Sequence, residues 1–195
     1  MTTFLFENDP QLVEAFGSIS LIEKYSDYIK EICTNIRDKS LNKENLESIL
    51  KKYNKNLENI KEEILDMLLD YINFILKDNF ITEKEAGNFN LLKRFFKIKE
   101  GDFYNYRYQQ VKNILNKQFQ IIYSDNRINS EEALLKVGLQ ELFGLSYDQF
   151  LEIANEEVKA ALERGANLNE LDTVLMKKKK PNVYKQLFVK LFMRK

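Results

Sequence analysis

The sequence predicts an all-α fold, a single compact domain of roughly seven to nine helices. Three observations predict it. Apolar residues recur at intervals of three and four nearly everywhere along the 195 residues. No segment of four or more residues alternates convincingly between apolar and polar side chains, as a half-buried strand would. Only 6 Gly and 2 Pro interrupt the chain, which disfavours β architectures with many turns.

Three apolar stripes predict the helices of the first part of the chain. They run over residues 21–36, 46–53 and 57–76. The polar breaks between them are short, as connections between packed helices usually are. We expect residues 1–56 to form an N-terminal helical hairpin and residues 57–172 to form the main domain.

A motif that occurs twice predicts an internal duplication of a helix-loop-helix unit. The pattern Asp-Asn-x-Ile-x-x-x-Glu-Ala occupies residues 78–86 and again residues 125–133, which is 47 positions later. Nine of 33 positions are identical between residues 71–103 and 118–150. We expect a helix to end at each Asp-Asn pair, because both residue types tolerate turn conformations.

The same motif predicts where the following helix begins. Thr82 and Asn129 stand at the expected N-cap, and Glu85 and Glu132 follow three residues later. This spacing is that of a capping box, in which the cap side chain and the glutamate bond each other's backbone amides. A helix is expected to run from each box to Phe96 or Phe143.

The motif Asp-x-x-Ile-x-x-x-Glu at a helix junction, twice in an all-helical chain, resembles the TerB-like (tellurite-resistance B) family. The resemblance covers about residues 57–164, including the closing turn at residues 142–150. Asn79 and Asn126 replace the family's usual glycine, and Phe80 and Arg127 leave the loops less acidic. The resemblance implies an interaction domain without established catalytic activity. It also implies a role in stress-response systems, membrane-associated complexes, co-chaperones or phage-defence gene clusters.

The loop acids are candidate metal ligands, as the resemblance implies for some family members. The set is Asp78, Glu85, Asp125 and Glu132, whose hard oxygen atoms suit Ca²⁺ or Mg²⁺. The pattern of an EF-hand is not met, because its third and fifth positions carry no carboxylate here. The interpretation we favour is structural: the aspartates accept loop amides, the glutamates complete capping boxes, and no cofactor is bound. A divalent-metal sensor on the same fold is the alternative.

The composition argues against most classes of enzyme. The chain has no His and one Cys, so it forms no histidine-based triad, no histidine or multi-cysteine zinc site and no internal disulfide. Cys33 lies in an apolar stripe with Ile29, Ile32 and Ile36, which predicts a buried thiol. We expect a protein that is not an enzyme and has no small-molecule substrate.

Aromatic residues gather just after residue 101 and predict an interface. Tyr104, Tyr106 and Tyr108 flank Arg107, and these residue types are typical anchors of protein interfaces. Base stacking would use similar residues, but Glu100 and Asp102 beside them repel phosphate. Core packing or contact with a protein partner is the better interpretation.

The C-terminal segment carries the strongest charge asymmetry. Residues 173–195 contain eight basic residues and no acid, including Lys177, Lys178, Lys179 and Lys180. After Pro181, apolar residues share one face, which predicts a basic amphipathic helix. Four interpretations stay open: docking on its own domain, contact with a protein partner or oligomer, binding to an anionic membrane surface, and binding to nucleic acid.

The N-terminus and the hydropathy pattern bear on localisation. Residues 1–9 contain two acids and no basic start, unlike a secretory signal. No apolar run approaches the roughly 18–20 residues that a membrane-spanning helix needs. The expectation is a cytoplasmic TerB-like interaction module in a bacterial stress-response or phage-defence complex. A peripheral membrane or nucleic-acid adaptor using the C-terminal helix is a further alternative.

Overall fold

The computed structural model is helical throughout the part of the chain that it describes, residues 9–167 and 171. Within that part there are eight α-helices and no strand, so the expected all-α fold of seven to nine helices is confirmed. None of these helices is long and apolar enough to cross a bilayer. The predicted C-terminal amphipathic helix and Lys177–Lys180 lie outside the described residues.

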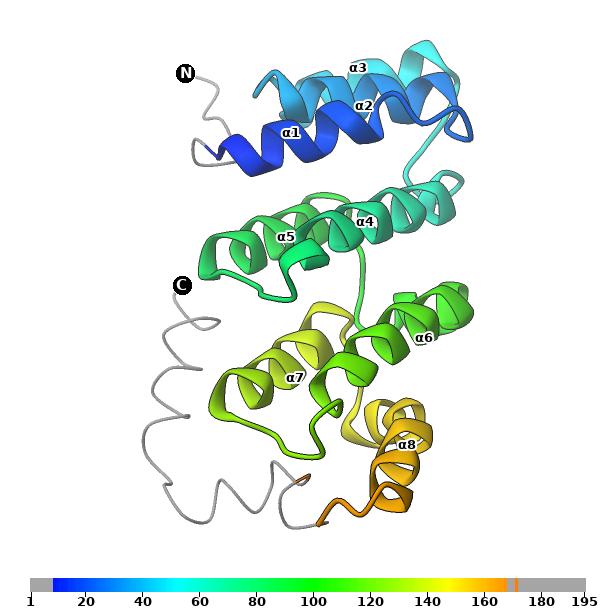
Figure 1. Cartoon of the computed structure of the whole chain (residues 1–195). Coiled ribbons are helices and arrows are strands. Elements are labelled where there is room, and N and C mark those ends of the chain that lie inside the picture. The colour runs from blue at the N-terminus through cyan, green and yellow to red at the C-terminus, as the bar shows by residue number, and fades with distance from the viewer. Residues whose placement is uncertain (1–8, 168–170, 172–195) are drawn as a thin grey trace. The chain divides into compact units, whose positions relative to one another are not determined.

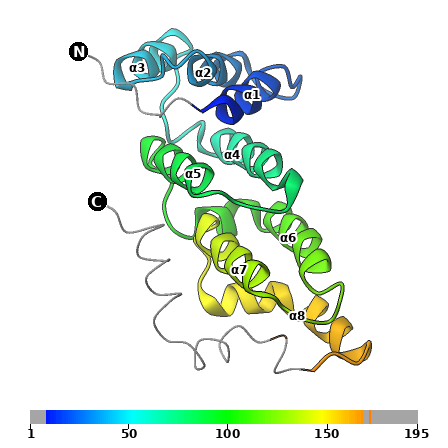
Figure 2. The same cartoon turned by 60° about the vertical axis from the view of Figure 1, so that its left-hand side comes forward.

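Two compact units divide the chain between Asp102 and Phe103. Within the first unit the N-terminal helices pack with α4. The boundary expected after residue 172 lies outside the described residues. The first unit contains five α-helices and a short 3-10 helix (Figures 1 and 2): α1 (Pro10–Ile19), α2 (Asp27–Arg37), α3 (Lys43–Lys52), α4 (Lys61–Ile75), η1 (Leu76–Asp78) and α5 (Glu83–Phe95). The second unit contains α6 (Asp102–Ile122, from its second residue), α7 (Ser130–Leu142) and α8 (Tyr147–Glu163).

Each unit is built from antiparallel helical hairpins with an apolar core. In the first unit α4 and α5 lie side by side beneath the layer of α1, α2 and α3 (Figures 1 and 2). The Tyr71 ring on α4 stacks on Phe89 of α5, with 6.3 Å between ring centroids. In the second unit the Phe119 ring on α6 meets Phe150 of α8 edge to face at 5.2 Å. Such aromatic contacts add to the burial of apolar area that holds the helices together.

One turn geometry recurs seven times along the described chain. In each turn a residue in the left-handed conformation donates its amide to the carbonyl three positions earlier, at 2.9–3.3 Å: Lys39, Asn54, Asn79, Lys97, Asn126, Gly144 and Gly165. A new helical turn follows four of them within seven residues, closed by an amide that bonds the carbonyl four positions earlier: Leu46 to Asn42, Ala86 to Thr82, Ala133 to Asn129 and Phe150 to Ser146. The duplication seen in the sequence is therefore part of a longer series of helical hairpins.

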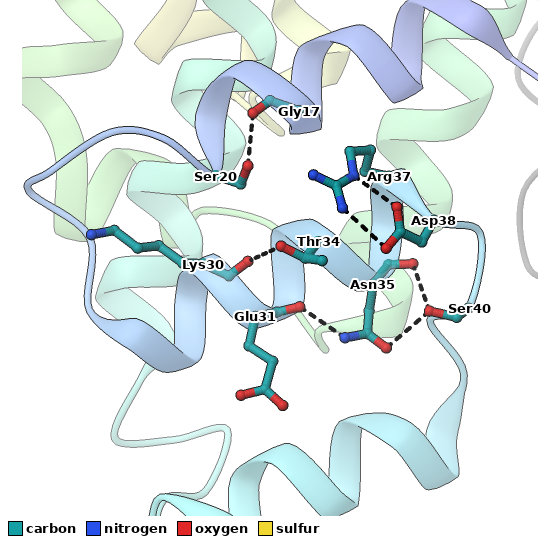
Figure 3. Close-up of polar contacts among 9 residues, drawn as sticks. All are labelled: Gly17, Ser20, Lys30, Glu31, Thr34, Asn35, Arg37, Asp38 and Ser40. Carbon is teal, nitrogen blue, oxygen red and sulfur yellow. Dashed lines mark hydrogen bonds and ion pairs between the residues drawn. The ribbon is translucent and has the colours of Figure 1, made fainter.

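The turn between α2 and α3 shows how this geometry arises without the Asp-Asn motif (Figure 3). Asp38 pairs with Arg37 at 2.7 Å instead of holding a loop amide. The hydroxyl of Ser40 donates to the side-chain oxygen of Asn35 at 3.0 Å. The side-chain amide of Asn35 in turn donates to the Glu31 backbone carbonyl at 2.9 Å. The Ser40 amide also bonds the Asn35 carbonyl, so backbone and side chain together close the end of α2.

A further bond closes five of these turns. After Lys39, Asn54, Lys97, Gly144 and Gly165, the next amide donates to the carbonyl five positions earlier. The turns at Asn54, Lys97 and Gly144 join successive hairpins. The following segment is then capped by a side chain three residues ahead: Asn59 accepts from the Asn56 amide, Asp102 from the Lys99 amide and Gln149 from the Ser146 amide. These shared bonds set a common geometry for entry into α4, α6 and α8.

Candidate functional site

The first loop of the duplicated motif uses its two acids to hold backbone. The Asp78 carboxylate accepts the amide of Phe80 at 3.1 Å, which stabilises the left-handed turn at Asn79. Glu85 is buried, and its carboxylate accepts the Thr82 amide at 2.8 Å. The Thr82 hydroxyl accepts the Glu85 amide in return, which completes the capping box of α5.

The second loop repeats these contacts 47 residues later. The Asp125 carboxylate accepts the amide of Arg127 at 3.0 Å, next to the left-handed Asn126. Glu132 accepts the Asn129 amide at 2.8 Å, and the Asn129 side chain accepts the Glu132 amide at 2.9 Å. The two aspartates thus occupy equivalent loops, as the duplication predicts.

The four candidate metal ligands are not gathered into one cluster. Asp78 and Glu85 belong to the first unit, and Asp125 and Glu132 belong to the second. Each carboxylate accepts a hydrogen bond from a backbone amide of its own loop, and this bond stabilises the loop or the start of the next helix. Over residues 9–167 and 171, no three Asp, Glu or Cys side chains stand together in an arrangement suited to a metal ion.

The predicted aromatic interface lies at a break near the start of α6. Arg107 departs from helical geometry there, with φ −139° and ψ 31°. The position is equivalent to Ile60, the residue just before α4, which is also non-helical. The break changes the course of the helix between Tyr106 and Tyr108, so α6 consists of a short N-terminal piece and a longer piece that matches α4.

Two of the tyrosines face a single carboxylate of α8. The Tyr104 and Tyr108 rings meet edge to face, with 5.1 Å between centroids. Their hydroxyls point to the two oxygens of Glu152 at 3.3 and 3.5 Å, which is long for a hydrogen bond to a carboxylate. Desolvation and then the charge of Glu152 raise the pKa of Tyr104. Both rings are therefore held beside Glu152.

The other two residues of the predicted interface differ in exposure: Tyr106 is exposed and Arg107 is half-buried. Tyr106 is 49% exposed. The Arg107 guanidinium donates to the Tyr106 carbonyl at 2.8 Å, at the point where the helix breaks. The structure thus brings Tyr104, Tyr106, Arg107 and Tyr108 together on one short stretch of surface, which we call the tyrosine cluster.

Sequence reasoning missed the contribution of α8. Besides Glu152, this helix exposes Tyr147 and Leu151, one helical turn apart. Glu156 pairs with Lys112 of α6 at 3.3 Å, and Glu157 accepts from Gln120 at 3.1 Å. The spacing of Tyr147 and Leu151 is visible in the sequence, but it is also the spacing of core residues. Only the structure shows that these side chains reach solvent.

The single thiol takes no part in the tyrosine cluster. Cys33 is fully buried in α2, as its apolar neighbours predict. Burial raises the pKa of the Cys33 thiol to about 12, so the reactive thiolate is scarce at neutral pH.

The chain was also compared with known proteins. It matches no protein family, no curated protein and no solved structure.

Proposed function

We propose that the protein is a non-enzymatic helical interaction module that binds a protein partner through the tyrosine cluster. The observation that carries the proposal is the break in α6 at Arg107, which presents Tyr106 to solvent between two tyrosines that Glu152 holds. Tyrosine and arginine are enriched among residues that dominate binding energy. Rings that are already held lose little conformational entropy when a partner binds.

The chemistry of this surface favours a protein over a nucleic acid. Glu152 lies between the two tyrosine hydroxyls, and the exposed Glu100 stands just before the cluster in the sequence. A phosphate backbone approaching here would meet these carboxylates and lose affinity. A partner segment with an aliphatic or basic side chain is attracted instead, because it can pack on the rings and pair with Glu152.

The absence of a catalytic role is part of the same proposal. The sequence has no histidine, and its one thiol is buried with a pKa of about 12. The carboxylates of the repeated loops hold backbone amides. None of these groups is arranged as an activated nucleophile beside a base.

The repeated loop geometry supports a TerB-like module in particular, and with it a role in a bacterial stress-response or phage-defence complex. Both Asp-Asn loops have a left-handed asparagine and a capping box, which suits a motif whose usual residue at that position is glycine. The pathway is tested by deleting the gene in its host and measuring survival under tellurite and under phage challenge. Survival equal to that of the parent strain in both tests would count against this role.

The binding surface is tested with a partner that co-purifies with the native protein. The double variant Tyr106→Ala, Arg107→Ala is expected to bind the purified partner at least about tenfold more weakly by calorimetry. Ile121→Ala is the matched control, since Ile121 is also an exposed large side chain on α6 but lies far along the helix from the break. Equal affinity of the double variant and the native protein would refute the proposed surface.

A further inference from the structure

The exposed side of α8 is acidic, and two of its acids have no cationic partner within the part of the chain that the structure describes. The helix contains five acids and one base: Asp148, Glu152, Glu156, Glu157 and Glu163 against Lys159. Glu156 pairs with Lys112 of α6 at 3.3 Å. Asp148 and Glu152 are exposed, and neither pairs with a described Lys or Arg.

Asp148 and Glu152 form an acidic row along α8. They stand four positions apart, which is about one helical turn, so their carboxylates project from one face of the helix. Like charges at this spacing repel each other. The one base of the helix, Lys159, stands seven positions after Glu152, about two turns away. A cation from outside the helix is therefore favoured beside this row.

An apolar row lies next to the acidic row. Tyr147 is 51% exposed and Leu151 is 42% exposed, and they also stand one helical turn apart. Each precedes one of the two acids by a single position, so the apolar row is rotated from the acidic row by about 100° around the helix. Covering these side chains would remove apolar area from water and stabilise a complex.

The tyrosine cluster meets the acidic row at Glu152. The hydroxyls of Tyr104 and Tyr108 reach the Glu152 carboxylate at 3.3 and 3.5 Å. These contacts are longer than the roughly 2.7–2.9 Å of a bond between a cation and a carboxylate. Glu152 therefore keeps acceptor capacity for a basic side chain, whose methylene stem can pack on the two rings.

We propose that the partner docks a basic amphipathic helix on this face of α8, an inference that rests on the interaction function proposed above. Its Lys or Arg side chains pair with Asp148 and Glu152, and its apolar side chains cover Tyr147 and Leu151. A helix fits because its own residues four positions apart match the one-turn spacing of both rows. Charge complementarity selects a basic partner over an acidic one.

Two matched peptides test the proposal on the full-length protein. One is a synthetic amphipathic helix of Leu and Lys, about four turns long. The other has Glu at every Lys position. Each peptide carries a dye, and its binding is followed by fluorescence anisotropy. We expect the Lys peptide to bind, and the Glu peptide to bind at least about tenfold more weakly. Equal binding of the two peptides, or no binding of the Lys peptide, would overturn the proposal.

Neutral variants locate the contact on α8. Asp148→Asn combined with Glu152→Gln is expected to weaken binding of the Lys peptide about three- to tenfold, since each exposed ion pair contributes modestly. The remaining affinity is expected to fall less steeply with added salt than that of the native protein. Glu163→Gln is the matched control, because Glu163 is an exposed acid at the far end of α8, and it leaves the affinity unchanged. An equal loss in the control would contradict the proposed contact.

A charge exchange separates lost recognition from lost folding. Asp148→Lys combined with Glu152→Lys is expected to reverse the preference, so that the Glu peptide binds more tightly than the Lys peptide. A misfolded protein would not gain a new preference, and circular dichroism checks that the helices are intact. A folded variant that still prefers the Lys peptide would overturn the proposal.

Two further comparisons distinguish this inference from its alternatives. Replacing Lys177–Lys180 with Gln leaves the affinity for the Lys peptide unchanged if the acids serve a partner; a rise would assign the acids to the chain's own lysines and refute the proposal. The co-purified partner tells the two proposals apart. If Tyr106→Ala, Arg107→Ala loses it while Asp148→Asn, Glu152→Gln keeps it, only the basic helix is refuted. If both variants keep it, both proposals fail.

Discussion

The side-chain amide of Asn88 on α5 donates a hydrogen bond of 2.7 Å to the Asp9 carboxylate, and both groups are buried. Asp9 is the N-cap of α1, and its other oxygen accepts the Gln11 amide at 3.1 Å. This contact ties the first described helix of the unit to the last. It joins residues 79 positions apart, so no local pattern in the sequence reveals it.

The Asn88 contact leads to a prediction for stability. Asn88→Ala leaves a buried carboxylate without one of its donors, and the free energy of unfolding is expected to fall by about 1–3 kcal/mol. Urea denaturation followed by circular dichroism measures the change. Asn73→Ala, on the exposed side of α4, is the control and is expected to change the value by less than about 0.5 kcal/mol. A loss for Asn88→Ala no larger than that of the control would contradict the assigned role.

The capping boxes lead to a second prediction. Thr82→Ala and Asn129→Ala each remove the acceptor of the N3 amide, so each is expected to lower the free energy of unfolding by about 1 kcal/mol. Thr34→Ala is a matched control, because the Thr34 hydroxyl bonds the Lys30 carbonyl within α2 (Figure 3) and caps nothing. Alanine favours a helix interior, so this variant is expected to keep its stability or to gain slightly. Similar losses in all three variants would argue against the capping role.

A third prediction concerns alkaline pH. Burial, and then the hydrogen bond and charge of Asp70, raise the pKa of Tyr25, whose hydroxyl donates to Asp70 at 2.5 Å. Burial raises the pKa of Cys33 to about 12 from 9.0. Each group holds its proton more tightly in the folded chain than in the unfolded chain. The stabilisation that these two groups contribute is therefore fully present below their pKa values in the unfolded chain, and it is lost as the pH rises above about 9–10.

Urea unfolding at a series of alkaline pH values measures this loss. The free energy of unfolding is expected to fall by up to about 1.4 kcal/mol per pH unit for each such group. Tyr25→Phe removes a titrating group. The free energy of unfolding of this variant is therefore expected to fall less steeply with pH, even though its absolute stability differs at every pH. A slope that is identical in Tyr25→Phe and the native protein would show that Tyr25 does not titrate in this way.

The fourth prediction concerns divalent metals. Asp78, Glu85, Asp125 and Glu132 each accept a backbone amide, so we expect Ca²⁺ or Mg²⁺ to leave the melting temperature nearly unchanged. A metal bound at a hundredfold excess over its dissociation constant would stabilise the fold by about 2.7 kcal/mol. That corresponds to a rise of roughly 5–10 °C for a domain of this size. A rise of that size, lost in Asp125→Asn, would favour the metal sensor instead.

The sequence predicted the second and third hairpin turns because their bonds are local. Asp78 and Glu85 contact residues two and three positions away, so the motif itself describes the geometry. The first hairpin turn has the same left-handed residue without the motif. Lys39 occupies that position, and the Ser40 amide bonds the carbonyl five positions earlier where the other two hairpin turns use the Asx contact. The same left-handed turn forms there with different residues, so no repeated motif in the sequence reveals it.

The candidate surface was predicted only in part. The tyrosine cluster is apparent in the sequence as a group of aromatic residues, and in the structure Tyr106 is exposed. The break at Arg107 was not predicted, because neither Gly nor Pro marks it. Glu152 comes from a helix more than 40 positions away, so its place between Tyr104 and Tyr108 depends on tertiary packing.

The closure of each hairpin by its own turn has a consequence for synthesis of the chain. Most bonds that define a hairpin join residues a few positions apart, so its loop-closure entropy is small and its folding is fast. During translation the hairpin of α2 and α3 is complete before α6 leaves the ribosome. Within each unit, later helices can then pack on a hairpin that is already folded, which limits the time for which its apolar face is open to aggregation.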